Sequence, residues 1–250
     1  MIRMLRVEWR KLLRRKEVYI LTLILVFLSF FVNYQLSLDN PALKIERTDG
    51  QIERISLPDL THLMANVLDH TGIFTVMLAV IIWNVIGREH DQKIVHHYFV
   101  NRPSRLDVYG AKILLSQKVM SILFLLFISS LLLFASIIKP NQVEITFTGE
   151  NWLELGKVFL LHMFMFFIYT LCAFLFSLYF GSIGTLMGTI GIWLLFTFLK
   201  FVEDADRLNP LIINDIFSLK SFSESILLNC LYVVVLGGIL IFFVMKKDVQ

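Results

Sequence analysis

The side chains that could carry chemistry are few, and three of the six histidines fall in one polar stretch. His90 and His97 would face the same way on a helix because they are seven residues apart, and His96 lies beside them. No carboxylate or cysteine completes the set at the spacing of a metal-binding motif such as H-E-x-x-H. We therefore interpret all three as exposed polar histidines and expect no metal site in this chain.

Other ionisable residues interrupt long apolar runs. His162 lies well inside one such run, and Asp69 and His70 lie together in another. An ionisable residue within a membrane-spanning segment is by default a candidate for function. Two interpretations remain open. These side chains either contact a transported substrate or lie among lipid headgroups near the outer ends of their spans.

The residue pattern does not predict an enzyme. The chain has no G-x-x-x-x-G-K-[ST] segment, whose backbone N–H groups would cradle phosphates, so we do not expect it to hydrolyse ATP. An intramembrane protease would need several His and carboxylate ligands, or a serine with a base, and His162 alone does not suffice. We expect no catalytic residue and no cofactor bound by this chain itself.

The elements around these residues are those of a membrane protein. Of the 250 residues 57% are hydrophobic and 17% are charged, whereas an average soluble domain has about 45–50% and about 25%. Both cysteines, Cys172 and Cys230, lie in apolar runs, which excludes a secreted disulfide scaffold. The predicted fold class is all-α and integral to the membrane, as a single domain over residues 1–250.

Apolar run length predicts how often the chain crosses the membrane. A spanning helix needs about 20 mostly apolar residues, and residues 158–199, which lack Asp, Glu, Lys and Arg, are about twice that long. We predict a break at residues 180–184, where glycine can turn the backbone. The six predicted spans are residues 18–38, 64–86, 113–138, 158–180, 183–202 and 226–245.

Basic residues predict the orientation. The segments on the same side as the N-terminus hold seven, six and two Lys and Arg, or 15, whereas the opposite segments hold three, two and three, or 8. By the positive-inside rule, both termini are expected in the cytoplasm, with the protein in the cell membrane.

Residues 1–17 are predicted to form an amphipathic interfacial helix. We expect Trp9 at headgroup level, with Arg10, Arg14 and Arg15 directed toward lipid phosphates. The alternative is that these charges only anchor the first span. A cleaved signal peptide is not favoured, because the apolar run of about 21 residues is too long and lacks a small-residue cleavage site. An apolar stripe within about 100° of arc supports the interfacial helix: Ile2, Leu5, Trp9, Leu12 and Leu13.

The one long connection on the predicted cytoplasmic side covers residues 87–112. Its apolar residues at helical spacing precede Pro103 and predict a short amphipathic helix at the membrane surface; they are Ile94, Val95, Tyr98 and Phe99. The next cytoplasmic connection, residues 181–184, is nearly absent. A soluble partner must therefore contact the 87–112 loop and the N-terminal helix.

In its layout the whole chain resembles the membrane subunits of type-2 ATP-binding-cassette (ABC) exporters. The shared features are a basic amphipathic lead-in, six spans with cytoplasmic ends, a coupling helix between spans two and three, and a polar Asn209-Pro210 stretch before the last span. Within the loop, Glu89, the Pro103-Ser104-Arg105 turn and Lys112 match the family's pattern. Lys93-Ile94 stands where that family usually has Gly-Thr.

The resemblance implies a partnership. Two membrane subunits, identical or related, would pair, and separate cytoplasmic ATPase subunits would bind ATP and magnesium and dock on the coupling loops. The implied cargo is an amphipathic peptide, a toxin or a hydrophobic drug moved out of the cell, and no nucleic acid partner is expected. The alternative is that the loop charges form only a solvated face and an anchor. By position, the coupling residues would be Arg88, Glu89, Asp91, Lys93, Tyr98, Phe99, Arg102, Pro103 and Arg105.

The fifth predicted span carries a face of small residues. Small residues let helices approach closely, and hydroxyl groups can hydrogen-bond across the contact. This face either packs inside one subunit or lines the seam between paired subunits. Its members are Gly184, Thr185, Gly188, Thr189 and Gly191.

Two other classes of function remain open: an ion-coupled secondary transporter or channel, and a membrane sensor or immunity protein that transports nothing. Ion-coupled carriers usually have charged residues at the membrane midplane and broken helices. The centres of the six predicted spans lack Asp, Glu, Lys and Arg. This pattern favours an exporter whose energy arrives from outside the membrane.

Overall fold

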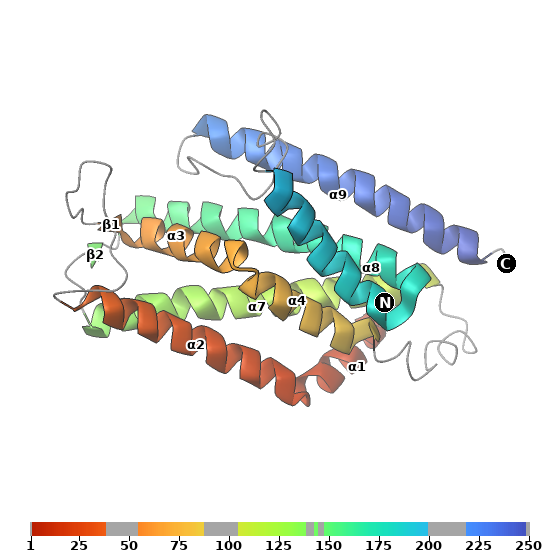
Figure 1. The fold of residues 1–250 in the computed structure, drawn as a ribbon, viewed down its shortest axis with the longest axis horizontal. Coiled ribbons are helices and arrows are strands. Elements are labelled where there is room, and N and C mark those ends of the chain that lie inside the picture. Colours follow the sequence, from red (N-terminus) through yellow and green to blue (C-terminus); the bar gives the residue numbers. More distant parts are fainter. Residues whose placement is uncertain are drawn as a thin grey trace.

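The computed structural model describes residues 2–38, 55–87, 105–138, 143–144, 148–199 and 219–248, and these are almost entirely helical (Figure 1). The elements in chain order are α1 (Ile2–Leu13), α2 (Lys16–Leu36), β1 (Ile55–Ser56), α3 (Leu57–His70), α4 (Ile73–Ile82), the π-helix η1 (Trp83–Gly87), α7 (Arg105–Ile138), β2 (Val143–Glu144), α8 (Gly149–Leu199) and α9 (Leu219–Asp248).

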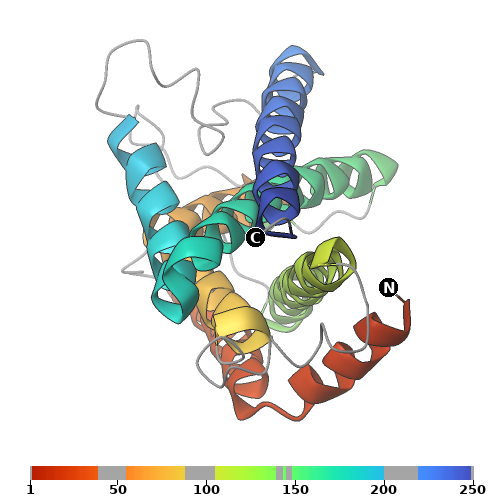
Figure 2. The ribbon, with the colours of Figure 1, turned by 90° about the vertical axis from the view of Figure 1, so that its right-hand side faces the viewer.

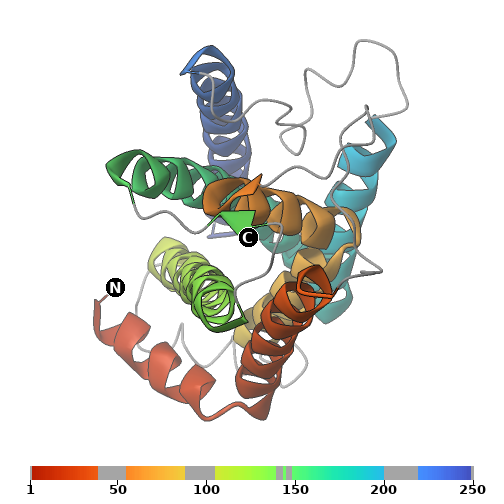
Figure 3. The same ribbon diagram turned by 90° about the vertical axis from the view of Figure 1, so that its left-hand side faces the viewer.

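The long helices lie side by side, and the bundle has two distinct ends. At the end that we call the β end, β1 and β2 form a two-stranded parallel pair with Ile55 opposite Val143 (Figure 3). At the other end, the terminal end, α1 lies across the bundle next to the start of α7, and the last turn of α9 lies there too (Figures 1 and 2).

The chain is a multi-pass membrane protein. Four of its described helices are long and apolar enough to cross a membrane, or five if the bent pair of α3 and α4 counts as one span. Large apolar side chains on the outside of the bundle are suited to contact with lipid; on α9, Leu227 is 75% exposed and Val234 is 71% exposed. The prediction of an all-α membrane protein is confirmed. This count, made on the described helices, does not reach the six predicted spans.

The helices begin earlier than the apolar runs predict. The second span was expected at residues 64–86, but α3 already begins at Leu57, where the Ser56 side chain caps the backbone N–H of Asp59 at 3.3 Å and a proline occupies the first turn. Similarly, α7 begins at Arg105, so residues 105–112 are helix rather than loop. Apolar composition marks the part of a helix in lipid, whereas caps mark where the helix starts.

The predicted break in the long apolar run lies at Gly181, whose φ of 60° and ψ of −135° are not helical. We call residues 149–180 the first arm of α8 and residues 182–199 the second arm. The second arm returns alongside the first, because a Cβ atom added at Gly188 would be 2.6 Å from the Cα of Ala173. A glycine is suited to the reversal because its left-handed φ is costly for other residues.

A cluster of phenylalanines joins α4, α7 and the first arm of α8. The Phe74 ring makes edge-on contacts with Phe124, Phe127 and Phe166 at centroid distances of 5.5 to 5.8 Å. All four side chains are about 1% exposed or less. Aromatic pairs of this geometry add to the stability gained from burial, so this cluster stabilises the contact between α4, α7 and the first arm of α8.

Candidate functional site

The second predicted span is interrupted between α3 and α4. α3 ends at His70 and α4 starts at Ile73, and the two helices are bent by 66°. Between them Gly72 has a φ of 74°, a left-handed conformation that favours glycine. Hydrogen bonds close both sides of the break, since the Gly72 N–H donates to the Asp69 carbonyl at 3.0 Å and the Val76 N–H donates to the Gly72 carbonyl at 2.9 Å.

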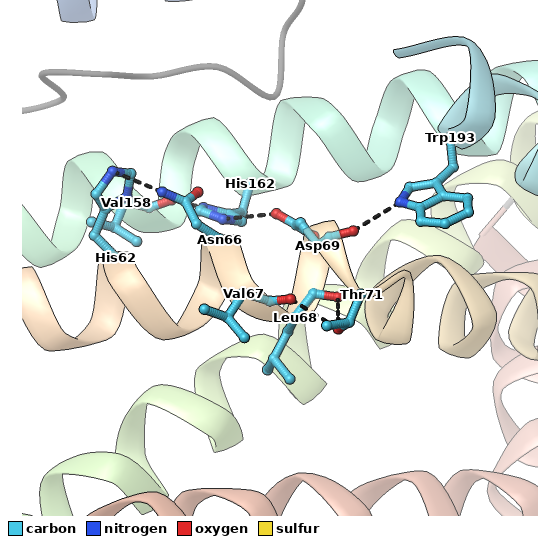
Figure 4. Close-up of polar contacts among 9 residues, drawn as sticks. All are labelled: His62, Asn66, Val67, Leu68, Asp69, Thr71, Val158, His162 and Trp193. Carbon is cyan, nitrogen blue, oxygen red and sulfur yellow. Dashed lines mark hydrogen bonds and ion pairs between the residues drawn. The ribbon is translucent and has the colours of Figure 1, made fainter. Parts of the chain in front are cut away.

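A tryptophan from the second arm of α8 holds this break. Trp193 donates its indole N–H to the backbone carbonyl of Asp69 at 2.8 Å (Figure 4). Its ring covers Gly72 so closely that an added Cβ atom would be 3.1 Å from the ring. Trp193 therefore joins the second arm of α8 to the break at Gly72.

Replacement of Gly72 by alanine should destabilise the chain by about 2 kcal/mol, because a left-handed backbone costs other residues about 1–2 kcal/mol and the new methyl group would press on Trp193. Thermal unfolding in detergent would measure the loss. Gly110→Ala on α7 is the matched control, since nothing lies within 4 Å of its added Cβ atom. Equal stability of the two variants would contradict this account of the break.

Beside the break, Asp69 on α3 and His162 on the first arm of α8 form a buried pair. The Nε2 of His162 lies 3.1 Å from Oδ2 of Asp69, and the two side chains are 3% and 4% exposed. The Nδ1 of the same ring lies 2.8 Å from the carbonyl oxygen of Val158. Phe124 stacks on the imidazole with ring centroids 4.9 Å apart. Both ring nitrogens thus face oxygen atoms in an apolar surrounding.

Further polar side chains continue from this pair along α3 and α8. Toward the β end, His62 and Asn66 are in contact on α3, with 3.1 Å between Nε2 and Nδ2 (Figure 4). On the other side, the hydroxyl groups of Tyr169 and Thr75 are close enough to interact with each other, and Tyr169 is within electrostatic reach of Asp69. Neither of these hydroxyl groups makes a hydrogen bond of good geometry with the described residues.

The sequence identified Asp69 and His162 as candidates but did not bring them together. It also suggested that Asp69 lies near the outer end of its span. Because α3 begins at Leu57, Asp69 instead lies 13 residues into the element, next to the break. His162 is enclosed by neighbouring helices rather than exposed on the bundle surface. The bend at Gly72 and the contact of Trp193 had no signal in the sequence that we recognised.

The arrangement is suited to holding a proton. A carboxyl group and an imidazole in contact can share a proton in a dry surrounding. Across the described ranges, no group of three or more His, Cys, Asp and Glu residues is arranged to hold a metal ion. The three predicted polar histidines, His90, His96 and His97, lie outside the described residues.

The small-residue face of the fifth predicted span packs within the chain. A Cβ atom at Gly184 would be 2.9 Å from the Cα of Ser177, and Gly188 lies equally close to the first arm. Thr189 is fully buried and donates its hydroxyl to the Thr185 carbonyl at 2.8 Å. The contacts that the structure describes on this face are those of packing inside one subunit, the first of the two interpretations.

At the terminal end, α1 lies against η1 and α7. The Lys118 ammonium lies 4.4 Å from the centre of the Trp9 ring, Leu12 is buried, and the Arg10 and Arg14 side chains are exposed. Arg15 is half-buried and lines a small cavity between α1, η1 and α7. One face of α1 is therefore covered by the bundle, while arginines remain on its outer face.

A buried lysine connects the two helices that flank the predicted coupling loop. Lys112 on α7 is 2% exposed, and its ammonium donates to the Val85 carbonyl of η1 at 2.8 Å. The Arg105 backbone begins α7. The remaining predicted coupling residues lie outside the described residues; they are Arg88, Glu89, Asp91, Lys93, Tyr98, Phe99, Arg102 and Pro103.

Comparison with models of known protein families, with curated proteins and with solved structures gives no match. The interpretation of function therefore depends on the residues and contacts described above.

Proposed function

We propose that this chain is the permease subunit of an ATP-driven exporter of the type-2 ABC class. Its whole layout resembles that family, and a mechanical link at the terminal end supports the proposal. There α1 packs on η1 and α7, and Lys112 joins η1 to α7 through the Val85 carbonyl. These elements border both ends of the predicted coupling loop.

The Lys112 contact is the observation that carries the proposal. A buried ammonium group is costly unless hydrogen bonds compensate it, so this contact ties η1 and α7 firmly together. A force applied to the segment between Gly87 and Arg105 would reach α4 and α7 at the same time. ATPase subunits gripping this segment from the cytoplasm would move both helices relative to the rest of the bundle.

The remaining parts of the proposal concern topology and partners. The chain has six crossings if each arm of α8 counts as one, the others being α2, the bent pair, α7 and α9. Both termini then lie on the same side. The excess of Lys and Arg supports a cytoplasmic location for the termini and a cell-membrane location for the protein. A second permease chain and separate ATPases holding ATP and magnesium complete the assembly. Its cargo is an amphipathic peptide, a toxin or a hydrophobic drug.

Charge reversal in the coupling loop should uncouple the ATPase. The chain is co-purified with candidate ABC ATPases, and vanadate-sensitive ATP turnover is measured in nanodiscs. We expect Glu89→Arg and Arg105→Glu each to lower the stimulated turnover about tenfold, because a like charge at a docking surface costs more than 1 kcal/mol.

The matched control is Lys220→Glu, near the start of α9 and thus at the β end, which should leave turnover unchanged. Normal docking and turnover in both loop variants would overturn the coupling role of the loop.

A second candidate function is ion-coupled transport. The buried Asp69–His162 pair beside a broken helix supports it, since both features are common in secondary transporters. Proteoliposomes that contain only this chain distinguish the two functions. Uptake of a cargo driven by a proton gradient, without any ATPase, would favour the second candidate and reject the first.

A further inference from the structure

We infer that Asp69 and His162 together form a binding site for a single proton, and that this proton joins α3 to the first arm of α8 beside the break at Gly72. The inference does not depend on the proposed ATP-driven function, because the proton can be counted in the isolated chain. It assigns a ligand to two residues that the coupling mechanism does not use.

The hydrogen-bond acceptors around the imidazole require this proton. The Val158 carbonyl oxygen can only accept, so the Nδ1 of His162, at 2.8 Å, carries a hydrogen and donates it. The Nε2 of the same ring is 3.1 Å from Oδ2 of Asp69. A hydrogen must lie between these two atoms, either on Nε2 beside a carboxylate or on a protonated carboxyl group that donates to Nε2. Both arrangements contain one proton and have no net charge.

The state without this proton is unfavourable in the same geometry. The lone pair of Nε2 would then face a carboxylate oxygen, and the pair would have a net negative charge. Burial makes such a charge costly, since both side chains are less than 5% exposed. Release of the proton therefore removes the hydrogen bond between Asp69 and His162 and replaces it by repulsion.

The titratable side chains that the structure describes next to the pair are neutral. On α3, the Nε2 of His62 accepts from the Asn66 amide and is thus unprotonated, whereas the side chain of His70, next to Asp69 in the chain, lies outside the described part of the structure. On the first arm of α8 the titratable neighbours are Tyr169 and, beyond it, Cys172, and both are neutral when protonated. The other packed elements contribute Thr75 from α4, Phe124 from α7 and Trp193 from the second arm, none of which titrates.

The proton has a structural consequence at the break. Asp69 provides its carboxyl group to His162 and its backbone carbonyl to Trp193, so one residue joins α3 to both arms of α8 (Figure 4). Loss of the proton weakens one of these two connections. The bend between α3 and α4 is thereby linked to proton binding inside the membrane domain.

Proton occupancy can be measured directly in the full chain. The chain is labelled with ¹⁵N-histidine in nanodiscs at pH 7, and the His162 signals are assigned by their loss in His162→Gln. Infrared spectra of the wild type and of Asp69→Asn are compared for a protonated carboxyl band. We expect either N–H signals from both ring nitrogens of His162 or a carboxyl band that Asp69→Asn removes. A singly protonated ring together with an ionised Asp69 would overturn the inference.

Discussion

Replacement of Gly188 by alanine should destabilise the chain by about 3 kcal/mol, the upper part of the usual range for overpacking a core. The added Cβ atom would be 2.6 Å from the Cα of Ala173 and 2.8 Å from the carbonyl oxygen of Cys172. Both neighbours are backbone atoms, so a rotamer change cannot relieve the clash. The two arms of α8 must move apart, which also shifts Trp193 from the break at Gly72. Unfolding in detergent, followed by circular dichroism, measures the loss.

Gly191→Ala is the matched control for this prediction. It lies on the same arm, is exposed, and has nothing within 4 Å of the added Cβ atom. Alanine favours a helix over glycine by about 0.5–1 kcal/mol, so this variant should be as stable as the wild type or slightly more so. A loss of stability in Gly188→Ala that depends on protein concentration would instead indicate that the face forms a seam between subunits.

Removal of His162 should have the largest effect of any single side chain at the site. His162→Leu leaves the buried Asp69 carboxylate without its histidine partner, and breaking a buried ion pair in this way costs about 3–5 kcal/mol. The double variant Asp69→Asn/His162→Leu should be more stable than His162→Leu alone, because a buried amide costs less than a buried carboxylate. Unfolding curves of the single variants and of the double variant form a complete cycle.

His62→Leu serves as the comparison on the same helix. His62 is half-buried and contacts a neutral amide, so its removal should cost about 1 kcal/mol. Two results would contradict this account. One is that His162→Leu lowers the free energy of unfolding no more than His62→Leu does. The other is that the double variant is less stable than His162→Leu alone.

Several features of the fold could be predicted from local sequence. The reversal of α8 was expected because a run about twice the thickness of the membrane core contains glycine at its middle, and the break lies at Gly181. The interfacial helix was expected from its apolar stripe, and α1 occupies Ile2–Leu13. Starts of helices were predicted less well, since the capping at Ser56 lies outside the apolar run that defines the second span.

The candidate site was predicted only as separate residues. Asp69 and His162 were each conspicuous as ionisable residues in apolar runs, but 93 positions separate them in the chain. Their contact depends on the bend at Gly72, which nothing in the local pattern distinguished from an ordinary glycine in a span. The expectation that the spans carry no central charge therefore misses a buried pair that belongs to two helices at once.

The sequence by itself determined that this chain is an all-α membrane protein with a basic amphipathic lead-in and a reversal in its longest apolar run. These properties are local, because the length, composition and periodicity of one segment decide whether it favours lipid, water or the interface between them. The tertiary structure alone decided that Asp69, His162 and Trp193 meet beside a bent helix. Such a meeting depends on helix register and on close contacts such as that of Gly188 with Ala173, which arise from many weak packing interactions between distant segments.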